Sequence, residues 1–132
     1  MKPLPIGAIA RVEYPTDAGH SAAAMGNTGV AVVSSIALIG FIEMACASHL
    51  EHLLDAGEAT VGVGFHFTHL APAPLGARVT VRAKLSAVAG RSIDFEVEAH
   101  DNARLLMTGR HRRAVIDLAA FMTRNGARDQ DL

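Results

Sequence analysis

SSIALIGFIEMACASHLEHLLDAG, residues 34–57, is the most apolar stretch of the chain and the one that decides its fold. Serine is a preferred helix N-cap residue, and the DAG at residues 55–57 is typical of a helix end. The first half of the stretch has no polar side, and a helix that is apolar all round is normally buried. We therefore expect one long buried helix with Ser34 or Ser35 as its cap.

Alternating apolar and polar residues, the pattern of strands with one buried face, fill most of the remaining chain. Turn residues at 90–91 and 101–102 separate the last three of these stretches, and a short helix is expected at residues 117–124. This order favours an α+β fold in which one antiparallel sheet wraps around the helix. The expected strands are residues 6–14, 59–70, 77–88, 92–101 and 104–118.

The length of the chain indicates a single compact domain spanning residues 1–132. Half of the residues are hydrophobic, 19% are charged, and the net charge is −1, which gives no reason to expect nucleic acid or a membrane as partner. The start of the chain lacks the apolar core of a secretory signal, and the single cysteine, Cys46, cannot form an internal disulfide. We therefore expect a cytoplasmic protein. Residues 15–33 are expected to form a lid-like loop, and residues 125–132 a frayed tail.

Glu43 stands out as a carboxylate within the apolar helix. A buried carboxylate costs several kcal/mol unless it is paired or protonated. Two interpretations are open at this point. Glu43 is either a structural residue paired with an arginine such as Arg82 or Arg113, or a general base or nucleophile beside a cleft.

His69 marks a second unusual segment, THLAPAPLGARVTV at residues 68–81, where a histidine ends a strand before a proline-rich turn. Side chains at strand ends often point into sites, although most such histidines are solvated. This segment, GFIEMAC at residues 40–46 and the 26-residue step from Glu43 to His69 resemble the hotdog-fold thioesterases related to fluoroacetyl-CoA thioesterase. SAVAGRSIDFEVEAHD and GRHRRAVI, later in the chain, extend the resemblance to residues 12–121.

The resemblance implies a hotdog fold and the hydrolysis of an acyl-CoA thioester to a free acid and coenzyme A. By position, it implies that Glu43 and His69 are catalytic and that Ser35 replaces a catalytic threonine while keeping the hydroxyl group. It places the backbone N–H of Gly62 at the thioester carbonyl and Arg113 beside the substrate channel. No cofactor is expected beyond the coenzyme A of the substrate.

The resemblance also implies a homodimer whose sheets pair edge to edge, with the active site at the subunit boundary. The long final strand is expected to be the exposed edge that this pairing covers.

These residue types suit thioester cleavage. Glu43 either attacks the carbonyl carbon or activates water together with His69, and a glycine lets a backbone N–H approach the carbonyl oxygen closely. If Ser35 and Glu43 are both helical, the eight residues between them span roughly 12 Å. Either Ser35 precedes the helix and folds back, or one site combines residues from two subunits.

The stretch MGNTGVAVV at residues 25–33 departs from the family pattern. The fluoroacetate-specific enzyme has phenylalanines in a lid before its helix, whereas this chain has glycines and small residues there. We therefore expect a substrate with a small or modest acyl group and no selectivity for fluoroacetyl. Whether coenzyme A or a carrier protein holds the acyl group is left open by the sequence.

Two other functions remain as alternatives. A hotdog dehydratase or hydratase also uses a carboxylate and a histidine, and a non-catalytic acyl-CoA-binding domain would keep the pocket without the catalytic pair. No metal site is expected, since His49 and His52 lie three residues apart without a third ligand nearby. Arginines are candidates for the phosphates of coenzyme A, although most are expected to solvate an outer face. They are Arg78, Arg82, Arg91, Arg110, Arg112 and Arg113.

Overall fold

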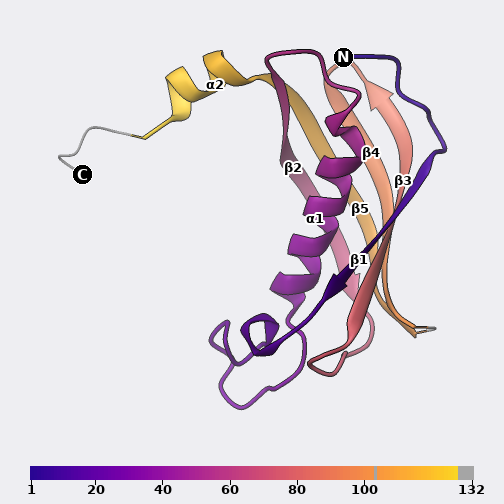
Figure 1. Ribbon diagram of the computed structural model, residues 1–132, viewed down its shortest axis with the longest axis vertical. Helices are drawn as coiled ribbons and strands as arrows, with labels where there is room; N and C mark the ends of the chain where they lie inside the picture. The colour runs from indigo at the N-terminus through magenta and orange to yellow at the C-terminus, as the bar shows by residue number, and fades with distance from the viewer. Residues whose placement is uncertain (103, 128–132) are drawn as a thin grey trace.

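One antiparallel sheet curves around one long helix, α1, as Figure 1 shows. The structure is a computed structural model, and it describes residues 1–102 and 104–127. The expected α+β fold is confirmed, and the expected closing helix is present as α2, which projects from the end of the sheet. The strands are β1 (Ile9–Pro15), β2 (Glu58–His69), β3 (Arg78–Ala89), β4 (Ser92–Asp101) and β5 (Arg104–Asp117), and the helices are η1 (Ala18–His20), α1 (Ser35–Glu51) and α2 (Leu118–Asn125).

The strands lie in the order β1-β3-β4-β5-β2, and every neighbouring pair is antiparallel. The hairpins β3–β4 and β4–β5 lead the chain back across the sheet, so that β5 lies between β4 and β2. The expectation that the final strand is an exposed edge is therefore wrong. Among the described strands, β2 forms the edge at this side of the sheet and β1 the edge at the other.

Helix α1 begins where the sequence predicted but ends earlier. Ser34 is the N-cap, and its hydroxyl oxygen accepts a hydrogen bond from the Ala37 N–H at 2.9 Å. The helix ends at Glu51 with His52 as the C-cap, so residues 55–57 belong to the turn that leads into β2. Gly57 has φ +83° in this turn, a conformation that glycine adopts without strain.

One face of α1 packs against the concave side of the sheet. The buried positions follow a helical spacing, and the side chains of Leu38, Ile42 and Leu50 are completely inaccessible to solvent. Truncating one of them to alanine is expected to cost about 2–5 kcal/mol of stability. The core that they form with the sheet includes Val79, Val81, Leu85, Ile93, Phe95, Val97, Leu106 and Val115.

The other face of α1 is not covered by the described part of the chain. Ile36 is 58% exposed and Met44 51% exposed, although both belong to the stretch that the sequence predicted to be buried all round. The expectation of a completely buried helix is therefore wrong for a single chain, because one curved sheet covers only one side of a helix. An apolar strip on an otherwise folded surface is typical of an interaction site.

The loop between β1 and α1, residues 16–34, includes the short helix η1, and its base is fixed by backbone hydrogen bonds. The N–H of Ala22 donates to Val32 O at 2.9 Å, and the N–H of Ser34 donates to His20 O at 2.8 Å. The Val33 N–H bonds Ala73 O at 2.9 Å, which joins the loop to the proline-rich turn after β2. The start of α1, the loop and the end of β2 are thereby held together.

No helix within residues 1–102 and 104–127 is both long enough and apolar enough to cross a membrane.

Candidate active site

Ser35 and His69 meet where α1 begins and β2 ends. Because Ser34 caps the helix, the Ser35 side chain is free for another partner. A hydrogen bond of 2.7 Å joins Ser35 Oγ to His69 Nδ1. Ser35 is therefore a helical residue that contacts the candidate histidine directly, and it does not fold back toward Glu43.

Glu43 lies two helical turns further along α1 and is paired with Arg113. The Arg113 Nη1 donates to Glu43 Oε2 at 3.4 Å, whereas Arg82 lies opposite Glu98 on the neighbouring strand β4. The Glu43 side chain is 40% exposed and the Arg113 side chain 6% exposed, so the carboxylate faces open space while its partner is buried. Glu43 is therefore accessible to a ligand in a way that a buried structural carboxylate is not.

A hollow of about 380 Å³ opens over Glu43 on the uncovered face of α1. The helix contributes most of its walls, and the Arg113 guanidinium closes the end toward the sheet. We call it the α1 hollow, and it is lined by Gly40, Glu43, Met44, Ala47 and Arg113.

Gly62 lies next to the Glu43 carboxylate on the edge strand. A β-bulge shifts the β2–β5 register here, so that Gly62 lies opposite Arg113 and Gly64 opposite Arg112, while Val63 is the extra residue. A Cβ atom at Gly62 would lie 2.6 Å from Glu43 Oε2, closer than real Cβ contacts allow. The glycine thus permits the carboxylate to approach the backbone of β2.

Arg113 is the centre of a hydrogen-bond network behind Glu43. Its Nε donates to Thr60 Oγ1 and its Nη2 to Thr60 O, both at 2.9 Å, and its Nη1 donates to His111 Nε2 at 3.2 Å. His111 Nδ1 in turn lies 2.9 Å from Gly64 O. A cation buried in this way is satisfied by its partners, as a buried charge has to be.

Sequence reasoning missed His111 and Thr60. In the segment RHRR at residues 110–113, only the arginines were predicted to take part in binding. Side chains alternate along a strand, so His111 and Arg113 point toward α1 while Arg110 and Arg112 point to the other face. This alternation is the signal that could have found His111.

Within one chain, the predicted site residues form two groups. One is Ser35 with His69, and the other is Glu43 with Arg113 and Gly62. Among the described residues, no hydrogen bond joins the two groups, and the eight residues between Ser35 and Glu43 correspond to roughly 12 Å along the helix axis.

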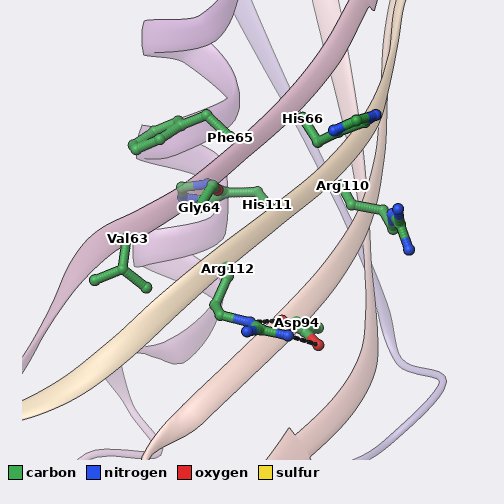
Figure 2. Close-up of a pocket in the computed structure, with 8 residues that line it drawn as sticks. All are labelled: Val63, Gly64, Phe65, His66, Asp94, Arg110, His111 and Arg112. Atoms are coloured by element: carbon green, nitrogen blue, oxygen red, sulfur yellow. Dashed lines mark hydrogen bonds and ion pairs between the residues drawn. The ribbon is translucent and has the colours of Figure 1, made fainter.

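The outer face of the sheet carries Arg110 and Arg112, and Figure 2 shows part of it. Arg112 donates to both oxygens of Asp94, at 2.7 and 3.1 Å, and this bond holds the pKa of Asp94 below its usual value. The hollow of about 290 Å³ drawn there also includes His66 and Arg110, which point away from α1. Arg110 lies opposite Glu96 on β4, so the basic residues of this face alternate with acidic ones.

Cys46 belongs to the core, and His49 packs against it. Cys46 is completely buried, and burial raises the pKa of its thiol to about 12, so it is not a nucleophile at neutral pH. The His49 ring packs against Phe95 at a centroid distance of 5.7 Å, and burial lowers its pKa. Among the described residues, no three potential metal ligands lie close enough to hold an ion together.

Known proteins share this sequence pattern and this overall fold. A model of the family described as fluoroacetyl-CoA-specific thioesterase matches residues 17–119. This chain belongs to that family. The fluoroacetyl-CoA thioesterase of Streptantibioticus cattleyicolor is 39% identical to it over 84 residues, which are 64% of this chain and 60% of that enzyme. The matched part therefore spans only three fifths of that enzyme's length.

Solved structures of a fluoroacetyl-CoA thioesterase extend the similarity to nearly the whole chain. One of them has a TM-score of 0.88 at 27% identity and covers 93% of this chain and 96% of its own. A second, a threonine-to-serine variant in complex with acetyl-CoA, has a TM-score of 0.88 at 28% identity and covers 92% and 96%. The hotdog fold of this family is thereby confirmed for this chain.

Proposed function

We propose that this protein is an acyl-CoA thioesterase, which hydrolyses a small or modest acyl-CoA to a free acid and coenzyme A. The observation that carries the proposal is the Glu43 carboxylate, held by buried Arg113 beside Gly62 and open to a hollow of about 380 Å³. Membership of the thioesterase family and the acetyl-CoA complex of a similar enzyme support the same substrate class.

The proposed reaction uses Glu43 as nucleophile or as the general base for water. A thioester carbonyl is electrophilic and a thiolate leaves readily, so an aimed carboxylate and a polarised carbonyl are the main requirements. The bulge at Gly62 brings the backbone of β2 close to Glu43, where its N–H is suited to stabilise the oxyanion. His69, oriented by Ser35, supplies the second acid–base group. Water is the only co-substrate, so no cofactor is needed.

We further propose that the enzyme is a homodimer in which β2 of one subunit pairs with β2 of the other. In support, β2 has a free edge among the described strands, and Phe65 on this edge is 50% exposed beside the uncovered apolar face of α1. Antiparallel pairing of two identical strands places the end of one beside the start of the other. Ser35 and His69 of one subunit would thus approach Glu43 of the other, which would unite the two groups of site residues.

The assembly is tested with a lysine on the β2 edge. Val63 is the exposed bulge residue, and in a symmetric strand pair Val63→Lys brings two positive charges near the twofold axis. We expect a lower mass by light scattering together with lower activity. Val88→Lys, at the exposed end of β3 and away from the β2 edge, is the matched control and should change neither the mass nor the activity. A wild-type monomer with full activity would refute the proposal.

The loop before α1 and the single cysteine support proposals for the acyl group and the cellular location. Gly26 and Gly29, in the loop over the start of α1, have positive φ values, and a methyl group added at either position would meet nothing within 4 Å. No ring therefore closes over the acyl group from these positions, which supports small or modest acyl groups rather than a fluoroacetyl-selective pocket. We propose a cytoplasmic location because the single cysteine, Cys46, is free and buried, and free thiols are typical of a reducing compartment.

The experiment that tests the activity measures free thiol release from a panel of acyl-CoA thioesters. Release of coenzyme A that depends on Glu43 supports a thioesterase. Hydration or dehydration of an acyl chain without thiol release would favour a dehydratase or hydratase, and tight binding without turnover would favour a binding domain. Either of these two results refutes the proposed hydrolysis.

A further inference from the structure

His111 is a buried titratable group that the proposed reaction does not use. It lies on β5 two residues before Arg113, and only 1% of it is exposed. Its ring packs against Phe65 at a centroid distance of 4.9 Å and against Phe67 at 6.2 Å. The two ring nitrogens contact different parts of the site, which is more than packing requires.

The contacts of His111 fix its tautomer. Nδ1 lies 2.9 Å from Gly64 O, and since a carbonyl oxygen only accepts hydrogen bonds, Nδ1 must carry the proton. Nε2 lies 3.2 Å from Arg113 Nη1, and since a guanidinium only donates, Nε2 must be the acceptor. Both contacts are satisfied together only by the neutral ring with its proton on Nδ1.

The surroundings of His111 favour the neutral ring. Burial lowers its pKa, and the Arg113 cation on the same strand acts in the same direction, while the Gly64 carbonyl and Glu43 on α1 oppose it. From β2, the residues that pack against the ring are the aromatic pair Phe65 and Phe67 and the glycines of the bulge. A proton on Nε2 would place a second cation against Arg113 and remove the acceptor.

The same Arg113 nitrogen that bonds His111 also donates to Glu43. Thr60 holds the other side of the guanidinium through two bonds of 2.9 Å, whereas Nη1 reaches His111 at 3.2 Å and Glu43 Oε2 at 3.4 Å. His111 therefore lies between the bulge of β2 that contains Gly62 and the cation that faces the carboxylate. Movement of its ring would disturb both.

We propose that His111 is a positioning residue, which accepts a hydrogen bond from Arg113 at Nε2 and thereby aims the guanidinium at Glu43, while its Nδ1–H holds the β2 bulge through Gly64. This inference rests on the proposed thioesterase function. It assigns His111 no contact with the substrate.

Two substitutions separate the two bonds. In His111→Gln the amide oxygen can take the place of Nε2 and accept from Arg113, whereas in His111→Asn the shorter amide can replace only the Nδ1–H donor to Gly64. Losing the acceptor for a buried cation should lower kcat by about tenfold or more, with a smaller change in KM. The glutamine variant should stay within about threefold of the wild type. Thermal unfolding of both variants checks that the difference is not one of folding.

The tautomer is measured independently of activity. In ¹⁵N-histidine-labelled protein, long-range ¹⁵N–¹H spectra distinguish a protonated ring nitrogen from an unprotonated one. We expect His111 to show a protonated Nδ1 and a free Nε2 even at about pH 6.5, where an ordinary histidine is half protonated. A protonated Nε2 would overturn the inference, whether or not the protein hydrolyses thioesters.

The failure of each proposal has its own result. If the folded wild-type protein releases no thiol from the panel, the proposed function fails, and the spectra still decide whether His111 accepts from Arg113. If the wild type is active and both the asparagine and the glutamine variants are as active as the wild type, the positioning role is refuted while the thioesterase function stands.

Discussion

Adding a single methyl group at Gly62 tests whether the position of the Glu43 carboxylate matters for turnover. The new Cβ of Gly62→Ala would lie 2.6 Å from Glu43 Oε2, whereas an ordinary contact needs at least 3.4 Å. The carboxylate therefore has to retreat by about 0.8 Å. The new Cβ would also lie 2.8 Å from the Phe65 ring, so the methyl cannot escape toward the strand edge without moving that side chain.

A displacement of this size has a predictable effect on rate. A misplacement of about 1 Å in a catalytic group can cost on the order of 10²-fold in turnover. We expect kcat of Gly62→Ala to fall by about that factor, with a smaller change in KM because the hollow keeps its other walls. Overpacking costs typically ~1–3 kcal/mol, partly offset by the ~0.5–1 kcal/mol that alanine gains over glycine in a strand. The protein should therefore stay folded and melt a few degrees lower.

The assay follows thiol release against substrate concentration, with thermal unfolding measured on the same samples. Gly64→Ala is the matched comparison, because its methyl group would meet Arg112 Cβ at 3.0 Å on the outer face and leave Glu43 in place. We expect that variant to lose less than about tenfold in kcat. If Gly62→Ala is folded and turns over substrate as fast as the wild type, the carboxylate does not need its observed position, and the assignment of Glu43 is wrong.

Three further predictions concern the reaction, the substrate and the thiol. Glu43→Gln and His69→Ala should each lower kcat/KM by at least ~10²-fold, and unchanged turnover in both folded variants would contradict their catalytic roles. Among fluoroacetyl-, acetyl-, butyryl- and phenylacetyl-CoA, kcat/KM should change gradually, since a pocket gains only about 1–3 kcal/mol of binding free energy per methylene. A preference of many thousandfold for fluoroacetyl-CoA over acetyl-CoA would contradict this prediction. Cys46, whose thiol pKa is raised to about 12 by burial, stays protonated at lower pH, so iodoacetamide should label it at pH 8 only after unfolding. Rapid labelling of the native protein would show that the residue is accessible.

Several parts of the site were visible in the sequence because they depend on local chemistry. Ser34 caps a helix in whatever fold contains it, and alternation of apolar residues predicted β4 over the same residues, 92–101, that the structure shows. A carboxylate in an apolar helix and a histidine before a proline-rich turn stood out from their neighbours at Glu43 and His69. The resemblance to a thioesterase family, now confirmed, came from the same segments.

Which residues meet, and which surfaces stay uncovered, was decided only by the tertiary structure. Ser35 bonds His69 and not Glu43, because the cap at Ser34 makes Ser35 helical and β2 ends beside it. The free edge belongs to β2 and not to the final strand, since two hairpins lead β5 back between β4 and β2. The hydrophobic pattern of an edge strand is the same as that of a central strand. Likewise, an apolar helix has the same pattern whether both of its faces are covered or only one. Both differences arise from contacts between residues far apart in the chain, which a local pattern does not contain.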